Sequence, residues 1–269
     1  LTCLQGAMNY AILPLKYIQA NPCVAVKIGK MPMDMTAKAH TEYICSAEEF
    51  NQILKRFPAD NCFHLSLVVP YNTGTRIGET FAIDLSQDVD FEKHELRIHG
   101  QMQKVEKTWY IKPPKYDSYR TIKMGETLEK ELKFAIQQRR INKLKYGGAY
   151  SKTYLLPDRS IAQIRADIDV PYKEILPLCV KENGALLTPD SFKYCARIIH
   201  YELNNPLFHA HCLRHTHGTI LAENGVNPKT VMERLGHKDI TTTLQTYTFN
   251  TDAMQQTAVD VFENAIQTQ

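Results

Sequence analysis

Residues 61–72 constrain the fold more than any other segment, because apolar side chains occur on nearly every side of the helix that they would form. Phe63, Leu65 and Leu67 are followed directly by two valines, so this helix lacks the polar face of a surface helix. A helix that is apolar all round has to be covered on all sides. We therefore predict that it lies at the centre of a domain, and the hydrophobic share of the chain, 43%, is large enough to build such a core.

Cap signals predict further helices around this one. Ser46 and Glu49 form the pattern of a capping box, which predicts a short amphipathic helix. Pro189 and Pro228 each follow a good capping residue, as is typical of a first helical turn, and Gly236 stands where a helix would end. Helices are expected over 1–20, 126–145, 189–204, 211–224, 228–235, 239–247 and 252–266.

Three runs in the first half of the chain have the composition of β-strands. Residues 94–102, 107–112 and 119–124 alternate in polarity and are rich in β-branched and aromatic residues. Residues 147–187 contain several prolines and give weak signals, so no element is predicted there. The expected fold is mainly α with one small three-stranded antiparallel β-sheet.

Composition excludes two broad classes of protein. The seven cysteines are odd in number and never form a Cys-x-x-Cys pair, which argues against a disulfide-rich secreted protein and favours a reduced, cytoplasmic one. No apolar run reaches the length of about 18 residues that a membrane-spanning helix needs. The formal net charge of +3 is compatible with binding to nucleic acid.

The segment HAHCLRHTHGT, residues 209–219, raises the choice between a zinc site and a phosphate site. His211 and His215 have the spacing of two zinc ligands on one helical face, which would suit a zinc-dependent hydrolase. However, residues 206–222 contain no Asp or Glu to act as a base, and the fixed positive charge of Arg214 would repel a metal ion. These features disfavour zinc, and we expect no metal.

A phosphate site fits the same segment better. Arginine offers a planar fork that bonds two phosphate oxygens at once, and His211 lies three residues before Arg214, on the same helical face. Upstream, TGTRIGE supplies a second arginine, Arg76. Downstream, ERLGHKDITTTLQTY supplies His237 and Tyr247.

These motifs together resemble the motif boxes of the tyrosine recombinases, the phage-type integrases. TGTRIGE, HCLRHTHGT, LGHKD and TYTF occur in the family's order along residues 42–250, and the details look closest to integrases of Gram-positive conjugative transposons. One departure is that Tyr247 lies ten residues after His237, where nine is frequent in the family.

The resemblance implies a role for each residue of these boxes. Tyr247 would be the nucleophile that forms a 3′-phosphotyrosyl bond. Arg76 and Arg214 would hold the non-bridging oxygens, and His211 and His237 would add hydrogen bonds. The 3′-phosphotyrosyl bond conserves the energy of the cut linkage, so ATP is not expected as a cofactor. A metal is not expected either.

The family also uses a lysine, on the turn between the second and third strands, to protonate the leaving oxygen. IKPPKYDSYRTI offers Lys112 and Lys115, and Lys115 aligns better with the family's Pro-Lys box. Lys115 is therefore the preferred acid, with Lys112 as the alternative.

The resemblance also divides the chain. Residues 1–30 would be the closing part of a helical core-binding DNA-binding domain, with an N-terminal portion of the natural protein missing. A linker over 31–44 would lead to a catalytic domain over 45–250, and residues 251–269 would form a tail helix that docks on a neighbouring subunit.

Partners follow from the same resemblance. We expect double-stranded DNA attachment sites, a homo-oligomer on DNA from dimer to tetramer, and an excisionase or host DNA-bending protein as a candidate accessory factor. The expected function is site-specific integration and excision of a mobile element in the bacterial cytoplasm, close to the nucleoid. The alternative is a catalytically silent DNA-binding accessory protein of the same fold.

Overall fold

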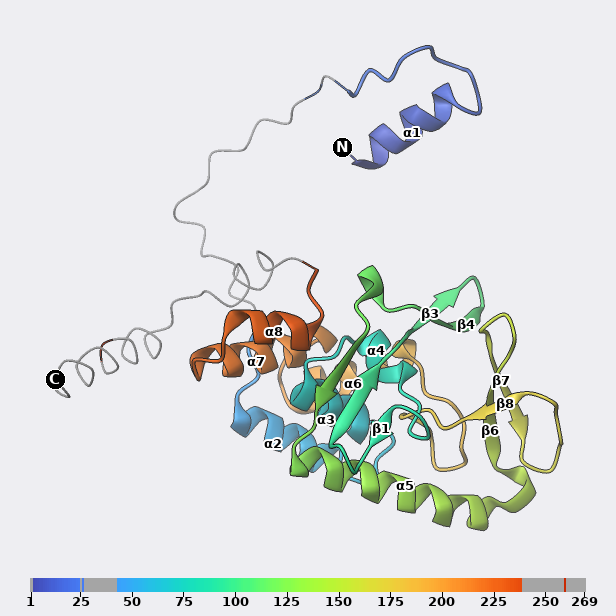
Figure 1. Cartoon of the computed structure of the whole chain (residues 1–269), viewed down its shortest axis with the longest axis vertical. Coiled ribbons are helices and arrows are strands. Elements are labelled where there is room, and N and C mark those ends of the chain that lie inside the picture. The colour runs from blue at the N-terminus through green and yellow to red at the C-terminus, as the bar shows by residue number, and fades with distance from the viewer. Residues whose placement is uncertain (1, 25, 27–42, 239–258, 260–269) are drawn as a thin grey trace. The chain divides into compact units, whose positions relative to one another are not determined.

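The computed structural model of the chain describes residues 2–24, 26, 43–238 and 259 (Figure 1). The chain divides into two compact units, Leu1–Thr41 and Glu42–Gln269, which are described separately below. The helices expected over 239–247 and 252–266, and with them Tyr247, lie outside the described residues, apart from Val259.

The first unit contains one described helix, α1 (Thr2–Ile12). The prediction of a helix over 1–20 was wrong in its length. Pro14 explains the early end, because proline disfavours helical backbone at the residue before it and cannot donate to the helical ladder. After this break, Nδ2 of Asn21 donates to Oδ1 of Asn9 at 2.6 Å, which ties the following segment back to α1.

The predicted central helix is confirmed in the second unit. It is α3 (His64–Thr73), in which Leu67 and Val69 are fully buried. It contacts α4 (Ile77–Ala82), α5 (Glu126–Tyr146) and α7 (Ala210–Glu223). The largest fully buried side chains around these helices include Phe57, Phe81, Leu128, Ile199 and Phe208.

The cap signals mark helix boundaries correctly. The reciprocal capping box of Ser46 and Glu49 opens α2 (Ala47–Arg56). Proline occupies the first turn of α6 (Pro189–Glu202) and of α8 (Pro228–Leu235). Gly236 ends α8 in the left-handed conformation, with a φ of 69°.

The β-structure is antiparallel, as predicted, but the run 94–102 is not one strand. It contains β2 (Glu95–Ile98), which pairs with β1 (Val89–Asp90) and β5 (Arg120–Lys123). It also contains β3 (Gln101–Val105), whose one partner among the described strands is β4 (Thr108–Lys112). The chain changes partner at Gly100. A Cβ there would lie 2.9 Å from Cγ2 of Ile111, so this close approach favours glycine.

A further sheet occupies part of the region for which no element was predicted. Its strands are β6 (Ser151–Leu155), β7 (Ile161–Arg165) and β8 (Lys173–Ile175), in the order β7-β6-β8. Figure 1 shows this sheet beyond the C-terminal end of α5.

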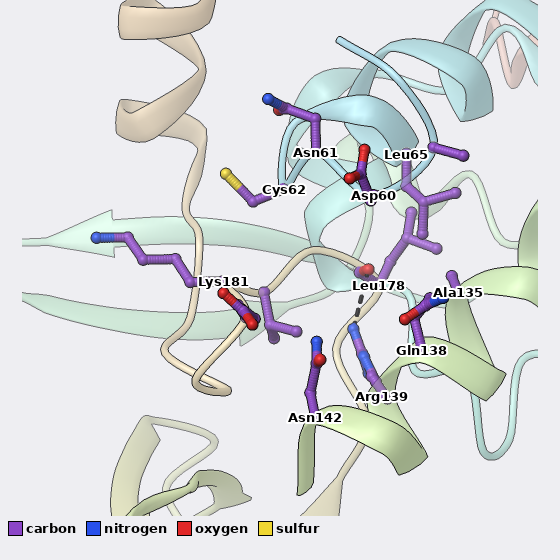
Figure 2. A pocket seen from close by; sticks show the side chains of 13 residues that line it. Asp60, Asn61, Cys62, Leu65, Ala135, Gln138, Arg139, Asn142, Leu178 and Lys181 are labelled. Carbon is purple, nitrogen blue, oxygen red and sulfur yellow. Dashed lines mark hydrogen bonds between the residues drawn. The ribbon is translucent and has the colours of Figure 1, made fainter. Parts of the chain in front are cut away.

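Arg139 of α5 fastens the segment that leaves this sheet. Its Nη2 donates to the carbonyl oxygens of Pro177 and of Leu178, the latter at 3.0 Å. Figure 2 shows Arg139 and the carbonyl of Leu178 at the wall of a pocket between α5 and residues 59–65 and 178–182. None of the described residues predicted for the active site lines this pocket.

Candidate active site

Arg76 is the N-cap residue of α4, and two neighbouring groups hold its guanidinium. Nη1 donates to Oε1 of Glu79 at 2.8 Å, and Nη2 donates to the carbonyl oxygen of Gly236 at 3.1 Å. The backbone N–H of Arg76 also donates to the Glu79 carboxylate, at 3.0 Å. Glu79 therefore orients Arg76, as the i, i+3 spacing on one helix allows.

Arg214 lies in the first turns of α7 and is only 3% exposed. Its Nη1 donates to the carbonyl oxygen of Gly74 at 2.7 Å. Gly74 ends α3 with a φ of 69°, and a Cβ at this position would lie 2.4 Å from Cδ2 of Leu235. The turn TGTR therefore carries the first arginine and also provides the acceptor for the second.

His211 and His237 lie in the electric field of both arginines. Burial, together with the charges of Arg214 and Arg76, lowers the pKa of His237 to about 4. Burial also lowers the pKa of His211, with Arg214 as the next largest cause. Both imidazoles are therefore neutral at pH 7, so each can donate one hydrogen bond and accept another.

The structure brings together four of the six predicted site residues. Arg76 contacts the residue directly before His237, and Arg214 contacts the turn directly before Arg76. His211 lies on the same helix as Arg214. This cluster joins three segments that are far apart in the sequence, which is the arrangement expected of a site for one phosphate group.

Two other histidines of the HAHCLRHTHGT segment, His209 and His217, support α7. Nδ1 of His209 accepts a hydrogen bond from the backbone N–H of Cys212 at 3.2 Å and so caps the helix. Nδ1 of His217 lies 2.9 Å from the carbonyl oxygen of Tyr71, and its Nε2 accepts from Nε of Arg234 at 3.0 Å. His217 is therefore the neutral tautomer with its proton on Nδ1.

Lys112 and Lys115 lie at the two ends of one short segment. Lys112 ends β4, and Lys115 begins a 3₁₀ turn, η1 (Lys115–Asp117), before β5. The carbonyl oxygen of Lys115 accepts a hydrogen bond from Oγ of Ser118 at 2.9 Å. The general acid thus stays a prediction for Lys115 with Lys112 as its alternative, and the predicted nucleophile Tyr247 is outside the described residues.

One residue beside the site was not found from the sequence. Arg120, the first residue of β5, donates through Nη2 to Oε2 of Glu79 at 2.7 Å, and its side chain is only 8% exposed. The available signal was strand alternation, since Arg120 lies on the same face of β5 as the buried Ile122. A charged residue on the apolar face of a strand requires a buried partner.

A pocket lined by β5, the segment before it and α8 opens beside His237. The cationic side chains in its lining are Arg120, Lys123, Arg234 and Lys238, with Glu233 as the acidic one. The excess of positive charge in this lining suits an anionic ligand.

The described part of the chain has neither a cluster of metal-ligating side chains nor a helix suited to a membrane. Over these residues, no group of three His, Cys, Asp or Glu side chains is arranged to hold a metal ion. No helix in the same ranges is long and apolar enough to cross a membrane.

Comparison with known proteins places most of the second unit in one sequence family. The model of the Phage integrase family matches residues 45–254. A "Tyrosine recombinase XerC-like" protein of Caldanaerobacter subterraneus is 27% identical over 271 residues, which cover 97% of this chain and 64% of that protein. The transposase from transposon Tn916 of Enterococcus faecalis is 26% identical over 231 residues, which cover 82% of this chain and 52% of that protein. The chain therefore spans less than two thirds of either relative.

Solved structures show the same fold. The integrase of transposon Tn1549, in complex with a circular intermediate DNA, matches with a TM-score of 0.62 and 20% identity over 95% of this chain and 76% of that one. The crystal structure of XerA recombinase matches with a TM-score of 0.51 and 17% identity over 83% of this chain and 66% of that one. The predicted fold, the mainly helical catalytic domain of a tyrosine recombinase with antiparallel β-structure, is confirmed. Where one three-stranded sheet was predicted, the described residues form three small sheets.

Proposed function

Because this chain belongs to the phage integrase family, we propose that it is a site-specific DNA recombinase that cuts and rejoins DNA through a covalent phosphotyrosyl intermediate. One observation carries the proposal: Arg76 and Arg214 are fixed by Glu79 and Gly74, and the charges of both arginines act on His211 and on His237. Two fixed cations and two neutral imidazoles suit a phosphodiester whose oxygens gain charge during the reaction.

The chemistry needs an attacking group, support for the phosphate oxygens and an acid. The phenolic oxygen of Tyr247 attacks the phosphorus, and the bond from phosphorus to the 5′ oxygen breaks. The neutral His211 accepts the phenolic proton. Lys115, or Lys112 as the alternative, donates a proton to the departing 5′ oxygen. Attack by a new 5′ hydroxyl then reverses these transfers and rejoins the strand without ATP.

The two arginines stabilise the transition state in this scheme. Arg76 uses Nη1 and Nη2 on Glu79 and Gly236, so these contacts set the plane of its fork before DNA arrives. Arg214 is set in the same way by Gly74. Preorganised donors contribute more than flexible ones, because no reorganisation is needed when charge develops.

Partners and setting follow from this function. The substrate is double-stranded DNA with attachment sites of a mobile element, and the outcome is integration and excision in the bacterial cytoplasm, close to the nucleoid. The domains that we propose are a core-binding segment over 1–30, a linker over 31–44, a catalytic domain over 45–250 and a tail over 251–269. We propose that the tail joins subunits into a dimer to tetramer on DNA, with an excisionase or DNA-bending protein as candidate helper and no metal or ATP.

Covalent trapping tests the function directly. The chain is incubated with a pool of nicked duplexes of randomised sequence, in which the nick lets the cleaved end diffuse away. DNA that stays attached after denaturation measures cleavage and identifies the cleaved sequence, called the selected duplex below. We expect an adduct with the wild-type chain, with and without a chelator, and none with Tyr247→Phe.

Each outcome has a clear meaning. An adduct with Tyr247→Phe would reject Tyr247 as the nucleophile. Binding of DNA by the wild-type chain without any adduct would favour the accessory DNA-binding protein, and loss of the adduct on chelation would favour a metal-dependent reaction.

A further inference from the structure

Arg120 is buried between three segments of the candidate site and uses all its side-chain nitrogens. Nε donates to the carbonyl oxygen of Arg234 at 2.8 Å, and Nη1 donates to the carbonyl oxygen of Ser118 at 3.1 Å. Nη2 donates to Glu79 at 2.7 Å, and Nη1 lies 3.4 Å from the other oxygen of the same carboxylate. With 8% of its side chain exposed, Arg120 has little surface left for a substrate.

Glu79 connects Arg120 to Arg76. Its side chain is fully buried between the two guanidinium groups. Burial alone would raise the pKa of Glu79, but the hydrogen bond and charge of Arg120, followed by the charge of Arg76, lower it overall. Without Arg120, the Glu79 carboxylate would keep only its two bonds to Arg76, one from Nη1 and one from the backbone N–H. It would lose the charged donor that ties it to β5, so the carboxylate and the Arg76 fork would be held less tightly.

The other acceptor of Arg76 also depends on Arg120. Nη2 of Arg76 donates to the carbonyl oxygen of Gly236, and a Cβ at Gly236 would lie only 2.8 Å from Nη1 of Arg120. Since Arg120 also holds the carbonyl of Arg234, it fixes the turn that ends α8 and leads to His237. Both anchors of Arg76 therefore rest on the same guanidinium.

The third contact of Arg120, with Ser118, connects it to the turn that contains Lys115. Ser118 accepts from Arg120 through its carbonyl oxygen and donates from its hydroxyl to the carbonyl oxygen of Lys115. Tyr116 and Asp117 in between have left-handed φ angles of 62° and 52°. Such backbone is unfavourable for residues other than glycine unless the surrounding contacts hold it.

We propose that Arg120 is a positioning residue for the reaction, which holds the fork of Arg76 in register with His237 and the Lys115 segment. This proposal rests on the proposed recombinase function. It adds to the proposed reaction a buried residue that acts through Arg76 and does not touch DNA. The competing explanation is that Arg120 only stabilises the fold.

The first test needs no DNA. Side-chain ¹⁵N signals of Arg76, assigned with Arg76→Lys, should show separate Nη resonances while both nitrogens are held. In Arg120→Met we expect these resonances to broaden or merge, because Glu79 and the Gly236 turn are no longer fixed by Arg120 and hold the fork less tightly. Arg139→Met is the matched control: it removes another partly buried arginine, shown in Figure 2, whose contacts are carbonyl oxygens of Pro177 and Leu178. It should lower the melting temperature and leave the Arg76 signals unchanged.

The second test uses cleavage of the selected duplex with a normal or a methylphosphonate linkage at the cut. A methyl group in place of one non-bridging oxygen removes the negative charge that Arg76 would neutralise. We expect Arg120→Met to cut the normal linkage on the order of 10–100-fold more slowly, as is typical when a group that orients an active residue is lost. On the methylphosphonate, Arg120→Met and Arg76→Ala should both come within a few-fold of the wild-type chain.

These outcomes separate the possibilities. Unchanged Arg76 signals in Arg120→Met, or an equal loss on both linkages, would overturn the positioning role. If Arg120→Met does not fold, Arg120→Lys keeps the charge but cannot reach Glu79, Ser118 and Arg234 together, and the same results are expected from it. A wild-type chain that forms no adduct would reject the proposed function, while the ¹⁵N experiment would still decide whether Arg120 holds Arg76.

Discussion

The carbonyl oxygen of Gly74 accepts a 2.7 Å hydrogen bond from Nη1 of Arg214, although the two residues are 140 positions apart. Gly74 also ends α3 in the left-handed conformation, two residues before Arg76. One turn of backbone therefore fixes the distance between the two arginines of the site. Its geometry depends on glycine, because a side chain there would meet Leu235 and His217.

We predict that Gly74→Ala destabilises the domain and slows cleavage. The left-handed backbone alone costs about 1–2 kcal/mol for a residue with a Cβ, and the contact of 2.9 Å with Cδ2 of His217 adds to it. Gly225→Ala is the matched control, since Gly225 has a φ of 72° and open space around its Cα. Urea unfolding should show a larger loss for Gly74→Ala. Equal losses would mean that the packing around Gly74 is adaptable.

Lysine in place of either arginine should separate catalysis from binding. Arg76→Lys and Arg214→Lys keep the positive charge but lose the fork. Removal of one preorganised donor typically slows a reaction about 10²–10³-fold, so we expect adduct formation to fall by that order while affinity for the selected duplex changes only a few-fold. Cleavage at the wild-type rate in either variant would reject the assignment of that arginine.

The general acid can be identified with a substrate that needs no acid. A 5′-bridging phosphorothiolate has a leaving group that departs readily as a thiolate. Lys115→Ala should therefore cut the normal duplex slowly and the phosphorothiolate at close to the wild-type rate. Arg214→Lys is the control that stays slow on both. Rescue of Lys112→Ala in place of Lys115→Ala would move the role to Lys112.

The buried histidines predict how stability changes with pH. Burial lowers the pKa of His217 from 6.5 to about 4, and the charge of Arg234 contributes to this. Between these values the unfolded chain binds a proton that the folded domain does not, so the free energy of unfolding falls as pH decreases from 6.5 to 4. Above pH 6.5 this histidine adds no pH dependence. Urea unfolding at several pH values should give a shallower slope for His217→Gln, and an unchanged slope would mean that His217 takes up its proton in the fold.

The tail prediction concerns residues beyond those that the structure describes. Ala258, Val261, Phe262, Ala265 and Ile266 would form one apolar stripe on a helix over 252–266. If this stripe docks on a neighbouring subunit, Phe262→Asp should weaken higher-order complexes on the selected duplex in native gels and leave the protein soluble. Asn264→Asp introduces the same charge off the stripe and should have no effect. Insoluble Phe262→Asp would favour packing on the tail's own domain.

Local signals in the sequence determined much of this molecule. The capping box of Ser46 and the prolines that open α6 and α8 act within one helical turn, so their effect does not depend on the rest of the chain. The apolar character of α3 likewise predicts its burial whatever packs against it. The boxes around Arg76, Arg214 and His237 were found in the same way, since the spacing within each box is short.

Tertiary structure alone decided how these boxes meet. The split of residues 94–102 into β2 and β3 depends on which distant strand each half pairs with, and the sheet of β6, β7 and β8 follows from pairings that weak local propensity does not reveal. Arg120 lies 41 positions from Glu79 and 114 from Arg234. A buried ion pair is stable only where the fold excludes water and aligns both partners, and no pattern within a few residues of Arg120 contains that information.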